Sequence, residues 1–277
     1  MKDLESLFCN LYGSTGPYVI VLHGGPAAAG SAELLAKGLA DSFRVIEPYQ
    51  RGSSDTPLSV ARHIADIHEI VEKIPGGGKP ALVGESWGAM LALSYAAAHP
   101  QAIDALALVG CGTFDKTSRA KIIEILETRM DSRIRLELKS LETHVNDSSE
   151  RMRKRYALLT GLYDYAPIKT LADENNNLDT FDVRAHKETW DDMLRLQAKG
   201  IYPAAFSAIR SPIVMLHGSY DPHPGPMIRD SLLPHIPHLE YREWEKCGHR
   251  PWIEKYVQDE FFRALKDWLI LHCSNNM

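Results

Sequence analysis

The stretch that decides the fold is PALVGESWGAMLALSYAAAHP, from Pro80 to Pro100. It begins as a run of small and branched apolar residues, passes through Gly-Glu-Ser-Trp-Gly and continues as an alanine-rich apolar pattern. The run predicts a buried strand, and the continuation predicts a helix. A serine flanked by glycines at such a junction is typical of a sharp turn that exposes a nucleophile, here Ser86. The simpler alternative is a serine that caps the helix.

The composition limits the partners of the chain. Its 277 residues fit one large domain, or a domain with an insertion, and 44% apolar with 24% charged residues is ordinary for a globular protein. The net charge of -5 leaves no basic footprint for nucleic acid or an anionic membrane, so a small-molecule partner is expected. No signal peptide or membrane span is predicted, and the four cysteines have no disulfide-framework or metal spacing, so we expect a cytoplasmic protein with reduced thiols.

Short apolar runs alternate with helical patterns along most of the chain. The first five runs are continuous rather than alternating, as in strands covered by helices on both faces. We therefore predict an α/β fold with a doubly wound, mostly parallel sheet. The predicted strands cover residues 18 to 24, 43 to 49, 80 to 86, 105 to 112, 212 to 218 and 239 to 244.

The alternation stops in the middle of the chain. Between about residues 114 and 206, helical patterns follow one another without a convincing strand. We interpret 114–206 as a helical cap, or lid, inserted into a core domain formed by 1–113 and 207–277. The polar run from 172 to 182 is the predicted loop of this insertion.

The chemistry depends on the residues that accompany Ser86. An activated serine needs a general base, an acid that orients the base, and hydrogen-bond donors for the oxyanion. Asp221 and His249 each follow a predicted strand, which gives the chain order Ser, Asp, His. The backbone N–H groups of Gly25, in LHGGP, and of Trp87 are the candidate oxyanion donors.

These motifs together resemble the α/β-hydrolase superfamily in its serine-nucleophile branch. The matching segments are HGGP at 23 to 26, GESWG at 84 to 88, HGSYD at 217 to 221 and CGH at 247 to 249. The resemblance implies an α/β-hydrolase fold with an inserted helical cap. It also implies Ser86 as nucleophile, Asp221 as orienting acid, His249 as base, and Gly25 with Trp87 as the oxyanion hole. We expect no metal and no cofactor.

Within that superfamily, HGGP, QRG at 50 to 52 and SWG at 86 to 88 are similar to the proline iminopeptidase group. The chain departs from that group at Ala27, Tyr49 and Glu85, where the group usually has glycine, aspartate and glycine. Such aminopeptidases also need cap acids that hold the substrate ammonium group. No alignment assigns that role among the cap acids of this chain, which are Glu142, Glu150, Asp173, Glu174 and Glu188.

Other residues have weaker indications. Trp190, Met193 and Gln197 are spaced three and four apart and could line a pocket, although core packing explains the first two equally well. We expect Glu85 to hydrogen-bond its own loop. His23 and His217 are predicted to be structural, and a metal role is not expected for the remaining candidates, His223, His235 and His238. The basic cluster of residues 151 to 155 is predicted to be a solvated helix face.

The predicted function is hydrolysis of an ester or amide bond of a small substrate through an acyl-enzyme intermediate. A proline iminopeptidase-like aminopeptidase is the alternative within that chemistry. An acyltransferase would share the first half-reaction. A weakly catalytic ligand sensor is the alternative from another class, because a fold alone does not fix a function. Oligomeric state and substrate stay open.

Overall fold

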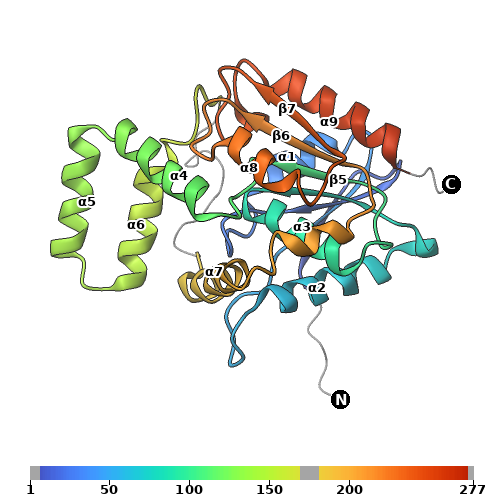
Figure 1. The fold of residues 1–277 in the computed structure, drawn as a ribbon, viewed down its shortest axis with the longest axis horizontal. Coiled ribbons are helices and arrows are strands. Elements are labelled where there is room, and N and C mark those ends of the chain that lie inside the picture. The colour runs from blue at the N-terminus through green and yellow to red at the C-terminus, as the bar shows by residue number, and fades with distance from the viewer. Residues whose placement is uncertain (1–6, 169–180, 274–277) are drawn as a thin grey trace.

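The computed structural model describes residues 7–168 and 181–273, which form a central sheet covered by helices (Figure 1). The loop predicted at 172 to 182 lies almost entirely outside the described residues, as do Asp173 and Glu174. The strands are β1 (Cys9–Tyr12), β2 (Tyr18–Leu22), β3 (Arg44–Pro48), β4 (Ala81–Glu85), β5 (Leu106–Val109), β6 (Ile213–Gly218) and β7 (Leu239–Trp244).

The sheet confirms the predicted doubly wound topology. Its spatial order is β1-β3-β2-β4-β5-β6-β7, and every neighbouring pair is parallel except β1 with β3. The edge strand β1 was not predicted from the sequence. This strand is short and lies at the sheet edge, where its residues are half-buried or exposed, so it lacks the continuous apolar run of the others.

Helices cover both faces of the sheet. Alternate residues of β2 explain why its apolar run is continuous, since Ile20 and Leu22 pack into the core on one face while Val19 and Val21 pack on the other. Helices α2 (Val60–Glu72), α3 (Trp87–Ala98) and α8 (Gly225–Leu232) cover the first face. Helices α1 (Glu33–Leu39) and α9 (Gln258–His272) cover the second.

Four further helices lie between β5 and β6. They are α4 (Lys116–Arg129), α5 (Ser132–His144), α6 (Ser148–Thr160) and α7 (Val183–Ala198). Figure 1 shows that α5 and α6 form a hairpin that projects from the body of the molecule, whereas α7 lies close to α2. The four helices follow one another without an intervening strand among the described residues, in the region that the sequence predicted to be helical.

Carboxylates fix α7 against the core. Asp182, the N-cap of α7, accepts hydrogen bonds from the N–H and the hydroxyl of Ser53, both at 2.7 Å. Asp192 accepts the N–H of Val60, the first residue of α2, at 2.9 Å. The N–H groups of Ser53, in a loop, and of Val60, at the start of a helix, have no partner within their own segment, and these carboxylates supply one. The start of α2 therefore depends on a helix about 130 residues further along the chain.

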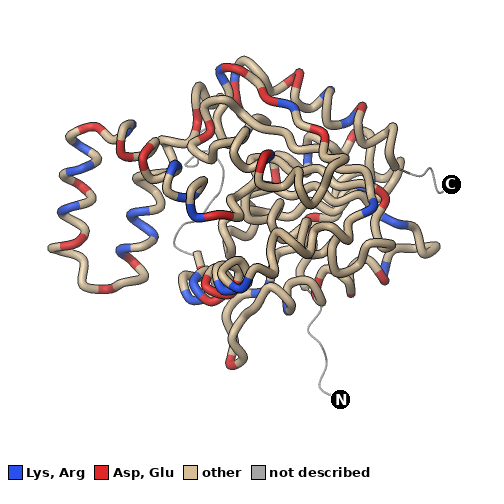
Figure 2. The backbone as a smooth tube through the Cα atoms, in the orientation of Figure 1, with Lys and Arg blue, Asp and Glu red and all other residues tan. Residues whose placement is uncertain are grey.

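The charged residues are mixed in sign on the helices. Figure 2 shows acidic and basic residues interspersed along α5 and α7, while the central sheet is mostly uncharged. Within the described residues, no helix combines the length and apolar character needed to span a membrane.

Candidate active site

The turn at Ser86 has the strained geometry that the sequence indicated. Ser86 connects β4 to α3 with φ +54° and ψ -115°, a conformation that L-residues rarely adopt. Its side chain makes no capping hydrogen bond, so a helix-cap role does not explain it. A Cβ atom at Gly84 would lie 2.3 Å from the carbonyl oxygen of Gly88, and one at Gly88 would lie 2.1 Å from that of Leu22. Both glycines are therefore required for the close approach of strand and helix.

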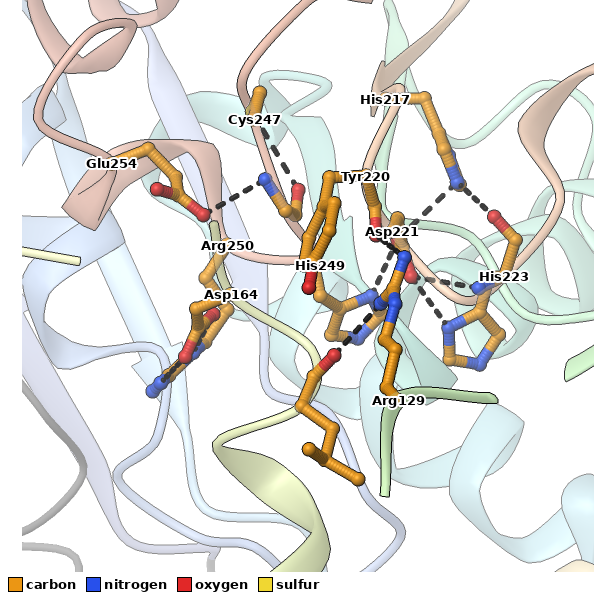
Figure 3. Close-up of polar contacts among 12 residues, drawn as sticks. Arg129, Asp164, His217, Tyr220, Asp221, His223, Cys247, His249, Arg250 and Glu254 are labelled. Atoms are coloured by element: carbon orange, nitrogen blue, oxygen red, sulfur yellow. Dashed lines mark hydrogen bonds and ion pairs between the residues drawn. The ribbon is translucent and has the colours of Figure 1, made fainter. Parts of the chain in front are cut away.

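Asp221 and His249 meet at the carboxyl ends of β6 and β7. His249 Nδ1 lies 2.6 Å from Asp221 Oδ2, and both residues are buried (Figure 3). Because a carboxylate only accepts hydrogen bonds, Nδ1 of His249 carries the hydrogen. The Nε2 atom of the neutral ring is then free to accept a proton. Burial opposes protonation of His249, but Asp221 outweighs burial and raises its pKa.

Two more histidines surround the same carboxylate (Figure 3). His223 Nδ1 lies 3.0 Å from Asp221 Oδ1, and His217 Nε2 lies 3.2 Å from Oδ2. Burial favours the neutral acid, but the imidazoles of His249, His223 and His217 together hold the pKa of Asp221 well below its usual range. His217 also bonds the carbonyl oxygen of His223, in agreement with its predicted structural role. His223 was not predicted to belong to the site, although it lies only two residues after Asp221.

Asp221, His223 and His249 also form the one group in the described chain whose ligand atoms, within 4.8 Å of one another, could hold a metal ion. Both Nδ1 hydrogens already point at the carboxylate, so an ion among these atoms would have to displace the hydrogen bonds. The arrangement therefore fits a hydrogen-bonded network better than a metal centre. His238 is elsewhere, where its Nε2 bonds the carbonyl oxygen of Ser211.

Two backbone amides beside Ser86 have no acceptor within the described chain. They belong to Gly25, which follows β2 with φ +66°, and to Trp87, the first residue of α3. A first-turn helix amide has no intrahelical partner, and its dipole favours a negative charge nearby. Both residues line the same cavity as Ser86. Paired free amides of this kind can bind an oxyanion.

The cavity above Ser86 has a volume of about 460 Å³. Ser86, Trp87, Gly25, His249 and Trp190 line it, and Trp190 packs edge-on against Trp87 at 6.4 Å between ring centroids. Part of the wall comes from α6, including Arg155 and Tyr156.

The other two predicted pocket residues lie elsewhere on α7. Met193 is fully buried in the core on the α2 and α3 face of the sheet. Gln197 donates to the carbonyl oxygen of Thr113 at 3.0 Å and accepts from Arg119. They share a helix face with Trp190, but α7 presents only its N-terminal part to the cavity, so one residue of the three reaches it.

Glu85 corrects the expectation made from the sequence. Its carboxylate does not bond its own loop. Instead Oε1 accepts the N–H of Gly24 at 2.7 Å and the hydroxyl of Ser31 at 2.8 Å, both in the segment that follows β2. Periodicity could not reveal this contact, because the partners are 61 and 54 residues away.

Buried ion and hydrogen-bond contacts hold the loop that carries His249 (Figure 3). Glu254, fully buried, accepts N–H groups from Gly248, Tyr165 and Ala166 at 2.6 to 2.8 Å. Arg250 pairs with Asp164 through Nη2 and Oδ2 at 2.6 Å. Tyr165, Ala166 and Asp164 follow α6, so the helical segment is fastened directly to the His249 loop. No pattern in the sequence indicated these residues, because their partners lie 86 to 89 residues away, apart from Gly248.

The sheet order, the strained serine turn and the cavity define an α/β hydrolase. The family model of the alpha/beta hydrolase fold matches residues 17–256, and the chain belongs to this family. The fold of this chain is therefore that of the α/β hydrolases.

Relatives with known names cover only part of the chain. The proline iminopeptidase of Neisseria gonorrhoeae is 38% identical over 102 residues, which are 34% of this chain and 33% of that protein. A probable proline iminopeptidase of Streptomyces coelicolor is 33% identical over 111 residues, or 35% and 34% of the two chains. These matches thus span about a third of the length of either relative.

Solved structures agree over nearly the whole fold. A serine hydrolase involved in carbazole degradation superposes with a TM-score of 0.67 and 20% identity, covering 95% of this chain and 94% of that one. A thermophilic esterase from Thermogutta terrifontis gives a TM-score of 0.64 with 18% identity, covering 97% and 94%. At these identities the likeness concerns the fold alone.

Proposed function

We propose that the protein is a serine hydrolase that cleaves an ester or amide bond of a small substrate through an acyl-enzyme intermediate. The observation that carries the proposal is the pair of free amides, Gly25 N–H and Trp87 N–H, on the cavity wall beside Ser86. His249 lines the same cavity, and its hydrogen bond of 2.6 Å to Asp221, which lies behind it, supports the roles of base and orienting acid. These groups are the parts that an acyl-transfer site requires, which supports the proposal.

In the proposed mechanism, the hydroxyl of Ser86 attacks the substrate carbonyl while His249 Nε2 takes its proton. The oxyanion binds the two amides, and its charge is stabilised there without reorganisation of the site. The protonated His249, stabilised by Asp221, then gives the proton to the leaving alcohol or amine as the bond to the carbonyl carbon breaks. Water, deprotonated by the same histidine, releases the acid and restores Ser86.

In this proposal, residues 114–206 act as the cap and select the substrate. Residues from α6 and α7 form walls of the cavity, whose volume of about 460 Å³ suits a small molecule. The bonds of Asp182 and Asp192 to the core hold the α7 wall in place, while the contacts of Glu254 hold the chain that follows α6.

The charges around the cavity favour an ester over an aminoacyl substrate. Arg155 lines the cavity and has no acidic partner in the described chain, so it repels a substrate ammonium group. Glu85 is the acid among the described residues that line the cavity, and its Oε1 already accepts two hydrogen bonds, so only Oε2 is left for a cation. A proline iminopeptidase-like activity remains the second candidate because of the 38% identity over 102 residues with the Neisseria enzyme.

The experiment is steady-state hydrolysis of two parallel panels, short-chain p-nitrophenyl esters and aminoacyl p-nitroanilides that include the prolyl compound, with Ser86→Ala as the control. Ester turnover that the variant loses supports the esterase reading. Prolyl release that the variant loses supports the aminopeptidase instead. Binding of panel compounds with less than one turnover per site would favour the ligand sensor, and turnover that survives Ser86→Ala would refute the proposed nucleophile. Added alcohols that capture the acyl group would identify an acyltransferase.

A further inference from the structure

A buried carboxylate lies directly beside the nucleophile. Glu85 ends β4, next to Ser86, and is only 5% exposed although it lines the cavity. A buried carboxylate is costly unless its oxygens are engaged. One oxygen, Oε1, accepts two hydrogen bonds, whereas Oε2 has no partner among the described residues and is not fully enclosed. A buried carboxylate therefore lies beside the nucleophile, and the two hydrogen bonds that Oε1 accepts suggest its role.

The two donors to Oε1 stand at opposite ends of one loop. Gly24 begins the loop after β2, and Ser31 lies just before α1. A single oxygen atom thus joins both ends of the loop from 25 to 30 and fastens the loop to the nucleophile turn. Gly25, whose free amide faces the site, is the next residue after the bonded Gly24.

The loop is also held from its other side. His186 of α7 lies with Nδ1 2.9 Å from the carbonyl oxygen of Gly25. Since a carbonyl oxygen accepts, His186 Nδ1 is the donor. Glu85 therefore fixes the peptide group between His23 and Gly24, and His186 fixes the one between Gly25 and Pro26, so the peptide group that carries the Gly25 N–H lies between two fixed neighbours. The carbonyl oxygen of this middle peptide group, that of Gly24, lies 3.0 Å from His23 Nδ1. Because Gly25 has φ +66° and no side chain, the orientation of its amide depends on these contacts together.

We propose that Glu85 is a positioning residue, which orients the Gly25 N–H toward the oxyanion by bonding Gly24 and Ser31. The proposal rests on the proposed serine-hydrolase function. The negative charge itself does not help, because it lies near the charge that forms on the oxyanion. What matters is that Oε1 is placed to accept hydrogen bonds from both Gly24 and Ser31. A glutamine amide oxygen can accept the same two hydrogen bonds, whereas alanine offers no acceptor.

The test compares Glu85→Ala, Glu85→Gln and Ser31→Ala with wild type, using p-nitrophenyl butyrate and a fluorophosphonate that labels the active serine. Glu47→Gln is the matched control, since Glu47 is a fully buried carboxylate on the neighbouring part of the sheet that does not line the cavity. We expect Glu85→Ala to lower kcat and the maximal labelling rate about tenfold to a hundredfold, as for a misplacement near 1 Å. The half-saturating concentration of the fluorophosphonate should change much less.

Rescue by the conservative variant distinguishes positioning from a general effect on folding. Glu85→Gln and Glu47→Gln should both stay within about threefold of wild type, and Ser31→Ala, which removes one of the two bonds, should fall between Gln and Ala at position 85. Circular dichroism melting identifies any variant that is unfolded. If Glu85→Ala does not fold, the role is still tested by comparing the other two variants: kcat and the maximal labelling rate of Ser31→Ala should be lower than those of Glu85→Gln.

The positioning role of Glu85 and the proposed serine-hydrolase function would be refuted by different results. A Glu85→Ala protein that is as fast as wild type, or a Glu85→Gln protein as slow as Glu85→Ala, would refute the positioning role while Ser86→Ala is inactive. Failure of the fluorophosphonate to label wild-type Ser86 would instead refute the proposed function.

Discussion

The imidazole rings of His223 and His249 stack with centroids 4.6 Å apart, and each places Nδ1 against a different oxygen of Asp221. The pKa values of the two histidines shift in opposite directions although both contact the same carboxylate. Burial dominates for His223 and lowers its pKa, whereas Asp221 outweighs burial for His249 and raises its pKa. On acidification His249 is therefore the first of the two to become charged, and His223 stays neutral beside it.

The rate of hydrolysis should consequently fall at acidic pH because a single group, His249, takes up a proton. A general base acts in its neutral form, so the rate falls as the pH drops through the raised pKa of His249, above the ordinary value of 6.5. Replacing Asp221 by Asn removes the largest contribution that raises this pKa. We expect Asp221→Asn to move the acidic limb to lower pH and to decrease kcat by about ten-thousandfold, as in a serine protease. A pH profile of kcat/KM measures both, and an unmoved limb would contradict the assignment of His249 as base.

The glycines of the nucleophile turn give a prediction for stability. Gly88→Ala would push a methyl group to 2.1 Å from the carbonyl oxygen of Leu22, so strand and helix must separate. We expect a loss of about 3 kcal/mol or more in the free energy of unfolding. Gly161→Ala is the control, because nothing lies within 4 Å of its added Cβ and its φ is -61°. Urea unfolding of the two variants makes the comparison; equal midpoints would show that the turn tolerates the methyl group.

The docking of α7 depends on the ionised carboxylate of Asp182. Burial opposes its ionisation, but hydrogen bonds from Ala185 and Ser53 outweigh burial and lower its pKa. Its contribution to stability is therefore complete above the ordinary carboxyl pKa and is lost as the pH falls through the lowered value. Asn has one acceptor oxygen and cannot serve both sets of donors, so Asp182→Asn should cost about 1 to 2 kcal/mol at neutral pH.

The control for this variant is Asp191→Asn on the same helix. Asp191 makes an exposed i,i+4 pair with Lys187, which contributes little. Thermal melting at pH 7 and at a series of pH values below 3.8, the ordinary pKa of the carboxyl group, should show a difference between the two variants that narrows as the pH falls. A constant difference would indicate that the charge of Asp182 is not involved.

Arg155 should set the preference of the site for substrate charge. Arg155→Glu replaces a cavity cation by an anion and should raise kcat/KM for a cationic aminoacyl ester, relative to a neutral ester of the same size, by about tenfold, as expected for charges a few ångströms apart in a solvated site. Arg153→Glu makes the same charge change on α6 outside the cavity lining. An equal shift in both variants would point to a general field of the helix rather than to contact with the substrate, and the shift should shrink in high salt.

Much of the fold could be predicted from local patterns. The six long apolar runs, the elbow glycines and the helical stretch between β5 and β6 are each visible in a short window of sequence. The edge strand β1 was not, because half-exposed residues lack the apolar run. The basic run at 151 to 155 shows the same limit: Lys154 and Arg155 are exposed, as predicted, but the sequence did not indicate that Arg155 also lines the cavity. Successive residues of a helix are rotated by about 100°, so the rotation of α6 decides which side chain borders the cavity.

The sequence by itself determined the turn at Ser86, because the backbone strain and the need for Gly84 and Gly88 are local to five residues. Only the tertiary structure decided that Asp221 would meet three imidazoles, and that Glu85 would bond Gly24 rather than its own loop. The contacts of Asp221 with His249 and of Glu85 with Gly24 join residues that are 28 and 61 positions apart in the sequence. His223, two residues after Asp221, bonds the same carboxylate. Their partners depend on how strand ends and loops pack in space, and one-dimensional periodicity contains no record of that packing.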